Sequence, residues 1–385
     1  MIPYGRQNIS QTDIDTVIDV LKSDFLTQGP KVPEFENTLK SYTGSKYAYA
    51  MNSATSALHV ACLALGLEKG DILWTSPISF VASANAGLYC GAMVDFVDIN
   101  PKTNNLCPEK LKEKLYIAHL SNTLPKILIP VHLCGQSCDM REIKKLCDRY
   151  SIKIIEDASH AIGASYLNAP VGNCAYSDIT VFSFHPVKII TTCEGGAALT
   201  NDKYLAEKIE LFRSHGITRD EKMMTEPSHG PWYYQQIELG YNYRMTDIQG
   251  ALGLSQMNRL NEFINKRHQI SKRYDKYLKR LPVLTPIKHK DTHSSIHLYI
   301  IRLKLEKISI SHKQVFERLR DNDIGVNLHY IPIHLQPFYN SLGFNIGDFP
   351  EAEKYYSEAI SLPIYTTLSL SDQDKVIDTL TSVII

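Results

Sequence analysis

The sequence predicts an α/β fold in which a mostly parallel sheet carries helices on both faces and a smaller α+β domain follows it. Two observations predict this class. Helical and strand patterns alternate from about residue 13 to 200, which is typical of a parallel sheet covered on both sides. At 385 residues the chain is also longer than one ordinary core requires, which favours two domains.

Composition and charge exclude several classes of partner. Lys plus Arg number 41 and Asp plus Glu number 41, so no overall field attracts nucleic acid or a membrane surface. No apolar segment approaches the ~20 residues that cross a bilayer. The first residues lack the charged-then-apolar run of a secretory signal, so we expect a cytoplasmic protein.

Cysteine spacing gives no evidence of a disulfide framework or a metal site. All eight cysteines lie between Cys62 and Cys193, too sparse for a disulfide-rich secreted fold. The closest set, Cys134, Cys138 and Cys147, lacks zinc-ribbon spacing and a clustered fourth ligand. We expect structural thiols in a reducing compartment and no metal.

The alternation in the first half of the chain can be assigned segment by segment. Short apolar runs bounded by turn residues predict strands, and periodic runs opened by small polar residues predict helices. The predicted strands cover residues 72–76, 93–97, 126–131, 152–155 and 179–184. The predicted helices cover residues 55–65, 80–87 and 140–150.

After residue 249 the pattern changes and predicts a second domain. The segment 250–280 reads as one long helix rich in Lys and Arg, which joins the two parts. We therefore predict a large domain over 13–250, a small domain over 251–385 and an N-terminal arm over 1–12. Within the small domain we expect a strand from 297, helices over 313–322 and 351–360, and a short strand before His329.

The most informative segment is Val181–Leu199, in which an apolar run ends in a lone lysine, Lys188, followed by Thr-Thr and Gly-Gly. Burial disfavours the charged form of a lysine and makes the neutral amine available as a nucleophile. An enzyme anchors the aldehyde of pyridoxal 5′-phosphate (PLP) with such an amine. The alternative is a lysine that simply emerges at the end of a strand.

A carboxylate that could face the pyridine nitrogen of PLP follows another buried strand. Asp157 stands at the end of Ile154–Asp157, and Glu156 is its rival. Because side chains alternate along a strand, only one of the two can face the ring. The alternative for Asp157 is a cap on the next helix.

The run Asn52–Ala57 (NSATSA) opens the first long helix of the sheet domain and could hold a phosphate. Small hydroxyl residues there offer hydroxyl groups, free backbone N–H groups and the positive end of the helix dipole. Ordinary N-capping explains the run equally well. Ser183 could also reach the phosphate, and Phe80 could cover the ring or belong to the core.

Five ordered motifs then resemble the DegT/DnrJ/EryC1/StrS family of PLP-dependent nucleotide-sugar aminotransferases, which have the fold-type I architecture. The motifs are NSATSA from Asn52, EDASH from Glu156, SFHPVK from Ser183, EGGA from Glu194 and GYNYRMTD from Gly240. The resemblance covers essentially the whole chain and implies a seven-stranded sheet. Fingerprints of dinucleotide, P-loop and Ser–His–Asp sites are absent from the sequence.

The resemblance implies a role for each matching residue. Lys188 is the expected covalent anchor and proton carrier, and Asp157 the partner of the pyridine nitrogen. Thr55, Ser56 and Ser183 are expected at the phosphate and Phe80 on the ring face. His160 stands near the ring hydroxyl, where many relatives have glutamine. Asn242 would reach the phosphate of a neighbouring subunit, which implies a homodimer with composite active sites.

The family resemblance also implies the substrates. L-Glutamate is the expected amino donor, and C4 of a UDP-2-acetamido-2,6-dideoxy-4-ketohexose is the expected acceptor. Some members carry histidine in place of the lysine and dehydrate the sugar, so Lys188 favours transamination. Candidates for sugar and diphosphate contacts are Tyr4, His185, Arg213, His215, Arg244, His329 and Tyr330. Another keto nucleotide sugar and a non-catalytic PLP-fold scaffold are the alternatives.

Overall fold

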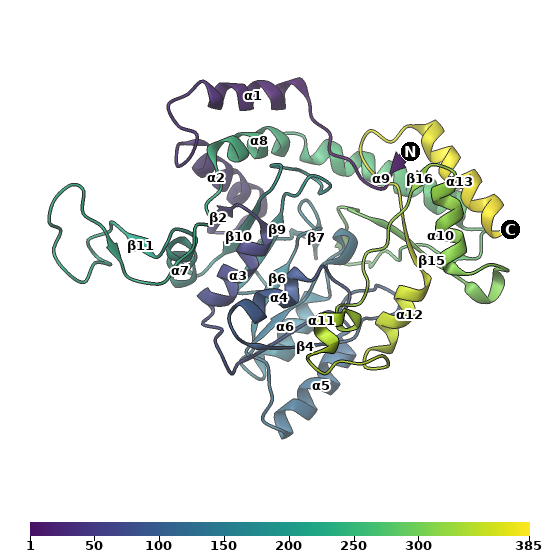
Figure 1. Cartoon of the computed structure of the whole chain (residues 1–385), viewed down its shortest axis with the longest axis horizontal. Coiled ribbons are helices and arrows are strands. Elements are labelled where there is room, and N and C mark those ends of the chain that lie inside the picture. Colours follow the sequence, from purple (N-terminus) through teal and green to yellow (C-terminus); the bar gives the residue numbers. More distant parts are fainter.

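In the computed structural model, which describes residues 1–385, seven strands form one central sheet (Figure 1). The strand order is β2-β10-β9-β6-β5-β3-β4, and only β10 runs antiparallel to its neighbours. The strands are β2 (Tyr47–Met51), β3 (Ile72–Thr75), β4 (Met93–Phe96), β5 (Ile127–Ile129), β6 (Lys153–Asp157), β9 (Ile179–Ser183) and β10 (Gly196–Thr200). The predicted mostly parallel sheet is confirmed.

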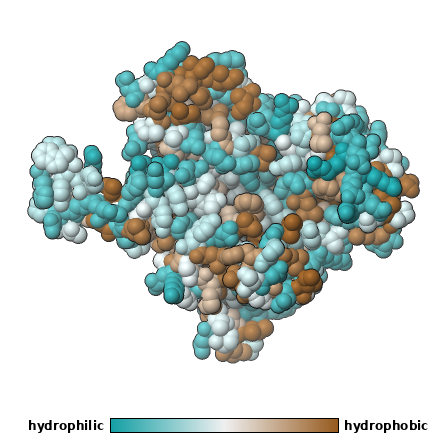
Figure 2. All heavy atoms as spheres, in the orientation of Figure 1, coloured by the Kyte–Doolittle hydropathy of each residue, from teal (hydrophilic) through white to brown (hydrophobic).

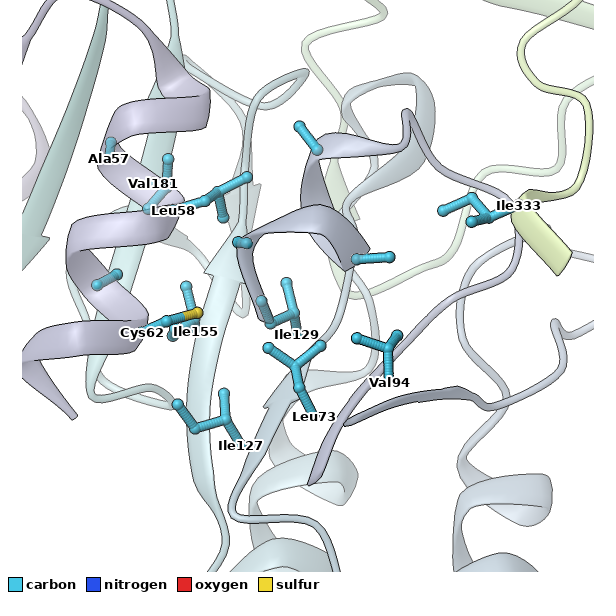
Figure 3. Close-up of a cluster of buried hydrophobic side chains, with 14 of the residues drawn as sticks. Ala57, Leu58, Cys62, Leu73, Val94, Ile127, Ile129, Ile155, Val181 and Ile333 are labelled. Carbon is cyan, nitrogen blue, oxygen red and sulfur yellow. The ribbon is translucent and has the colours of Figure 1, made fainter. Parts of the chain in front are cut away.

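Alternating side chains of the sheet enter apolar cores on both of its faces. Ile127 and Ile129 of β5 join the core beneath α3 and α4, while Leu128 between them joins the core beneath α5 and α6. Figure 3 shows the first core, where α3 presents Leu58 and Cys62 to the sheet. The flanking helices are α2 (Lys31–Thr43), α3 (Ala54–Ala64), α4 (Ala82–Tyr89), α5 (Pro108–Leu120), α6 (Met140–Asp148), α7 (Lys203–Arg213) and α8 (Asp247–Met257).

The C-terminal part builds its own core around a three-stranded antiparallel sheet. Helix α9 (Leu260–Leu278) joins this part to the rest of the molecule. Its first half packs Phe263 against the large sheet, and its second half packs Tyr274 into the small core. The other elements are β13 (Val283–Leu284), β15 (Tyr299–Leu303), β17 (Ala359–Leu362), α10 (His312–Asp321), α12 (Pro350–Glu358) and α13 (Leu370–Ile384).

Peripheral elements complete the chain. The N-terminal arm pairs β1 (Ile2–Pro3) with β16 (Ile324–Gly325), and a hairpin of β11 and β12 projects from the body (Figure 1). None of the helices combines the length and apolarity needed to cross a membrane. The remaining elements are α1 (Gln11–Leu21), β7 (Ser165–Tyr166), β8 (Ala169–Pro170), β11 (Ile217–Thr218), β12 (Gln235–Gln236), β14 (Thr292–His293), α11 (Pro337–Asn340) and 3-10 turns at 133–135, 305–307 and 333–335.

The predicted helix over 250–280 is wrong in one respect, because two helices occupy this segment. Helix α8 ends at Met257, and Arg259 has a backbone conformation outside the helical region. The guanidinium of Arg259 reaches the buried Asp13, a contact between distant parts of the chain. No Pro or Gly marks the break, so sequence periodicity runs through it.

One helix end and one strand end also differ from the prediction. The expected helix over 351–360 ends at Glu358, because residues 359–362 pair with β15. Strand β9 ends at Ser183, so Lys188 lies five residues beyond it, in the loop toward β10. Pro186 has no N–H to donate to a sheet, and the N–H of Lys188 instead donates to the carbonyl of His185.

Candidate active site

A cavity of about 540 Å³ lies at the carboxyl ends of the parallel strands, bounded on one side by the C-terminal part of the chain. Ligands bind at this edge in open α/β sheets. Strand β6 contributes Asp157 and strand β9 contributes Ser183. Ten of the residues singled out from the sequence line the cavity: Tyr4, Thr55, Phe80, Asp157, His160, Ser183, His185, Lys188, His329 and Tyr330.

Lys188 is the candidate nucleophile of this cavity. Burial lowers the pKa of its amine to about 8, while the charge of Asp157 acts in the opposite direction. A lysine at its ordinary pKa near 10.4 would be almost entirely charged at neutral pH. The lowered pKa therefore leaves a larger fraction of Lys188 as the neutral, reactive amine.

Asp157, rather than its rival Glu156, faces the cavity. One Asp157 oxygen accepts a 2.6 Å hydrogen bond from the hydroxyl of Ser83, and the other accepts a 3.1 Å bond from the N–H of Ser159. Glu156 points to the opposite side of the sheet and lies 2.7 Å from the ring of the buried His132. Burial by itself raises the pKa of Glu156, but the hydrogen bond and charge of His132 outweigh burial and lower the pKa.

Ser83 was not recognised in the sequence, although it supports Asp157 directly. It lies on α4 and is fully buried, and its hydroxyl also lies 2.7 Å from that of Ser79. Its position one helical turn after Phe80 is the only signal that could have indicated it. A small polar residue on a buried helix face is otherwise common in the core.

The N-terminus of α3 forms a site suited to a phosphate group. Ser53 caps the helix by accepting a bond from the N–H of Ser56, and the first backbone N–H groups have no partner within the helix. Thr55 lines the cavity, whereas the hydroxyl of Ser56 lies 2.7 Å from the side-chain oxygen of Asn52. A Cβ atom on Gly196 would lie 2.4 Å from the nitrogen of Ala54, so only glycine permits this close approach.

Aromatic side chains enclose the opposite side of the cavity. The ring of Phe80 is exposed, and its centroid lies 6.2 Å from that of Tyr330. His160 accepts a 3.3 Å bond at Nδ1 from the N–H of Cys134, so Nε2 carries the proton toward the Tyr330 oxygen at 3.1 Å. Burial and the charges of Lys188 and His329 lower the pKa of His160 well below its usual value, which keeps the ring neutral.

His297 also lines the cavity and was not recognised in the sequence. Its ring lies 4.4 Å from that of His160, it is 3% exposed, and its Nδ1 has no hydrogen-bond partner. Burial lowers its pKa well below the usual value. A histidine just before a strand is normally interpreted as a core residue, so only the fold reveals this position.

The small domain and the N-terminal arm provide the remaining wall. His329 bonds at Nδ1 to the hydroxyl of Ser361 at 2.8 Å, and the ring of Tyr4 lies 5.1 Å from that of His329. Burial, followed by the charge of Lys188, lowers the pKa of His329 to about 4. The imidazole is therefore neutral and available for hydrogen bonding.

Five other predicted residues do not line the cavity in this chain: Ser56, Arg213, His215, Asn242 and Arg244. Arg213 contacts Glu36 through Nη1, and the same nitrogen donates a 2.8 Å bond to the carbonyl of Ala50. Asn242 is exposed and its backbone pairs with Ser214. The roles predicted for these five residues stay predictions.

Comparisons with known proteins identify the family. Residues 7–381 match the model of the DegT/DnrJ/EryC1/StrS aminotransferase family. The chain is 41% identical over 385 residues to the UDP-4-amino-4,6-dideoxy-N-acetyl-beta-L-altrosamine transaminase of Campylobacter jejuni, covering 100% of this chain and 98% of that protein.

Solved structures agree with this match. Helicobacter pylori PseC, an aminotransferase involved in the biosynthesis of pseudoaminic acid, superposes with a TM-score of 0.90 at 33% identity, covering 100% of this chain and 99% of that one. The PLP form of Streptococcus pneumoniae Spr1654 superposes with a TM-score of 0.89 at 29% identity, covering 99% and 98%. These findings confirm the expected fold type and the expected cofactor, PLP. The chain is a PLP-dependent enzyme that belongs to the DegT/DnrJ/EryC1/StrS aminotransferase family.

Proposed function

We propose that this enzyme transfers the amino group of L-glutamate to C4 of UDP-2-acetamido-2,6-dideoxy-β-L-arabino-hexos-4-ulose. The product is UDP-4-amino-4,6-dideoxy-N-acetyl-β-L-altrosamine, an intermediate of pseudaminic acid biosynthesis. The observation that carries the proposal is the Lys188 amine, with its lowered pKa, facing Asp157 in one cavity. The full-length similarity to the Campylobacter jejuni transaminase supports this choice of sugar.

The residues of the cavity fit PLP. Lys188 would hold its aldehyde carbon, and Asp157 its pyridine nitrogen. The free N–H groups at the start of α3, with the hydroxyls of Thr55 and Ser183, would hold its phosphate. Phe80 would cover one face of the ring. When bound, PLP supplies a carbonyl for covalent attachment and a ring that withdraws electrons from the reacting carbon.

The protein's own contribution is to move protons and to hold the substrates. The Nζ atom of Lys188 would serve as base and acid in the reaction, and its pKa of about 8 allows it both to accept and to release a proton near neutral pH. The Asp157 carboxylate keeps its orientation through Ser83 and Ser159. His160 stays neutral and holds Tyr330 in the wall of the cavity.

We assign the sugar to the wall formed by Tyr4, His329 and Tyr330. Because the Nδ1 of His329 is engaged by Ser361, its Nε2 is free for a sugar hydroxyl or carbonyl. The neutral ring can donate or accept there without bringing a second charge near Lys188. His185 lies at the exposed rim, where diphosphate could reach it.

We further propose a homodimer in which each site is completed by the partner subunit. Asn242 and Arg244 lie outside the cavity of their own chain, and Asn242 is exposed. Their position on the segment beside His215 and the start of the projecting hairpin suits a contribution across a dimer interface.

The test of the catalytic proposal is a pair of half-reactions on the purified enzyme with PLP. L-Glutamate should bleach the absorbance of the lysine-bound cofactor and release 2-oxoglutarate. The UDP-4-keto-hexose should then restore the absorbance and yield the amino sugar, identified by mass spectrometry and NMR. If a UDP-4-keto-pentose or a dTDP-keto-6-deoxyhexose restored the absorbance faster, that sugar would be the better assignment. If L-glutamate did not bleach the absorbance, it would not be the amino donor.

Composite sites can be tested by mixing two defective variants. Lys188→Ala removes the anchor, and Asn242→Asp places a carboxylate against the partner's phosphate. In a mixed dimer one site carries both defects and the other carries neither, so random exchange should restore about one quarter of wild-type activity. No recovery, despite mixed dimers detected by native mass spectrometry, would show that Asn242 acts within its own subunit.

A further inference from the structure

A second, much smaller cavity shares Lys188 with the active-site cavity. Its volume is about 10 Å³, enough for one water-sized or monatomic species. It lies between the N-terminal arm, the loop that carries Lys188, and helices α8 and α9. The cavity is lined by Arg6, Gln7, Asn8, Pro186, Lys188, Ile189, Thr191, Gln256, Phe263, Arg267 and Thr366.

The lining of this cavity carries positive charge without any counter-charge. Arg6, Lys188 and Arg267 all line it, and no Asp or Glu does. Neither Arg6 nor Arg267 forms a salt bridge within the chain. The buried Asp13, which accepts a bond from the cavity residue Gln256, is also bonded to Ser255 and Arg259.

Arg267 is the least satisfied of these cations. It is 1% exposed, and its Nη1 donates to the carbonyls of Ile296, His297 and Ile364 at 3.3, 3.0 and 3.2 Å. Its Nε is buried and has no hydrogen-bond partner. Backbone carbonyls offer only partial charges, so a buried guanidinium without an anion is costly.

Other polar groups around the cavity are engaged elsewhere. The amide nitrogen of Gln256 donates to Asp13 and to the carbonyl of Asn8. The Thr191 hydroxyl donates to a backbone carbonyl. The Thr366 hydroxyl accepts from Asn8, which leaves its own hydrogen free. The groups still able to donate are therefore Nε of Arg267, the Thr366 hydroxyl, the Arg6 guanidinium, the Gln7 amide and the Lys188 amine.

We propose that this cavity binds one monatomic anion of the size of chloride, held by Arg267 and Thr366 and covered by Arg6. A phosphate or carboxylate exceeds the available volume. A water molecule could satisfy the hydrogen bonds, but it cannot compensate the positive charges of Arg6 and Arg267. The bound anion ties the N-terminal arm, and with it Tyr4, to the loop that carries Lys188.

The direct test is crystallography of the PLP-loaded enzyme in sodium bromide, with data collected at the bromine absorption edge. We expect an anomalous peak between Arg267 and Thr366. A water molecule or no density there, with bromide bound elsewhere, would overturn the proposal. This readout does not depend on any sugar substrate, so it stands apart from the proposed reaction.

Melting temperatures in solution distinguish specific binding from an ion that binds only at the high concentration used for the crystal. Replacing gluconate by bromide at constant ionic strength should raise the melting temperature by about 2 °C, because the anion binds only the folded state. The exposed Arg6→Gln and the hydroxyl-deleting Thr366→Val should lose at least half of this rise. Arg318→Gln, an exposed arginine on α10, is the matched control and should keep it. An equal rise in all four proteins would mean a general salt effect and no specific site.

Discussion

At the scale of single residues, the chemistry depends on how the surroundings of Lys188 tune its amine. Burial lowers the pKa, and the Asp157 carboxylate raises it again without reversing the effect. The two influences together place the pKa at about 8, where protonated and neutral forms coexist near physiological pH. The same carboxylate that we propose for the pyridine nitrogen thus limits the pKa shift of the lysine.

This balance predicts the pH dependence of cofactor loading. Below the pKa of Lys188 the amine is protonated, so covalent attachment of PLP to the apo-protein should slow about tenfold per pH unit below 8 and level off above it. Asp157→Asn removes the charge that raises the pKa, so the midpoint should move to lower pH. Stopped-flow absorbance measures both profiles, with the exposed Asp24→Asn as control. A midpoint that stays or rises in Asp157→Asn would contradict the assignment.

His329→Ala tests the sugar-side wall. We expect the ketosugar half-reaction to slow about tenfold or more, because the free Nε2 is lost, while the glutamate half-reaction stays nearly intact. Single-turnover kinetics of each half-reaction measure the two effects separately. His119→Ala, an exposed histidine on α5, should leave both unchanged. Equal loss of both half-reactions would refute a role confined to the sugar.

At the scale of elements, the approach of α3 to β10 determines the phosphate site. Gly196 opens β10 and lies against the first residues of α3, where a Cβ atom would come within 2.4 to 2.6 Å of three backbone atoms of Ser53 and Ala54. These backbone atoms cannot move aside for a Cβ atom in the way that the end of a flexible side chain can. The helix N-terminus can therefore lie beside the sheet edge only when this position is glycine.

Gly196→Ala should displace the start of α3 and weaken PLP binding about tenfold or more, since the phosphate loses aligned N–H donors. Fluorescence titration of the apo-protein with PLP measures the affinity. Gly5→Ala is a matched control, because a Cβ there would meet only the Val187 side chain at 3.5 Å. Unchanged affinity in Gly196→Ala would exclude α3 as the phosphate site.

At the scale of the whole molecule, one apolar surface is left exposed to solvent by the rest of the chain. It lies over α1 and the segment after it, at the top of Figure 2, and consists of Ile14, Ile18, Leu21, Phe25 and Leu26. Monomeric proteins rarely expose so many large apolar side chains together. We expect the second copy of this chain to cover this surface in the proposed homodimer.

The double variant Ile14→Glu, Ile18→Glu should shift the protein from dimer to monomer, because two carboxylates cannot be buried without partners. Light scattering coupled to size-exclusion chromatography measures the mass, and circular dichroism checks folding. Ile117→Glu on α5, at an isoleucine that is 64% exposed, is the control and should stay dimeric. A double variant that remains a dimer would place the interface elsewhere.

The sequence by itself determined the alternation of strands and helices and the limit that only one of Asp157 and Glu156 can face a ligand. These follow from local periodicity and from side-chain direction along a strand, which depend on neighbouring residues alone. Family resemblance then indicated the reaction class, which the comparisons confirm.

Only the tertiary structure decided which polar groups meet in the cavity. His297 reaches it from a distant segment, Ser83 supports Asp157 from α4, and Arg213 contacts Glu36 instead. The break before α9 likewise coincides with a contact between Arg259 and Asp13, and no Pro or Gly marks it in the sequence. Such contacts join residues far apart in the chain, and their energy depends on burial and geometry that no sequence window contains.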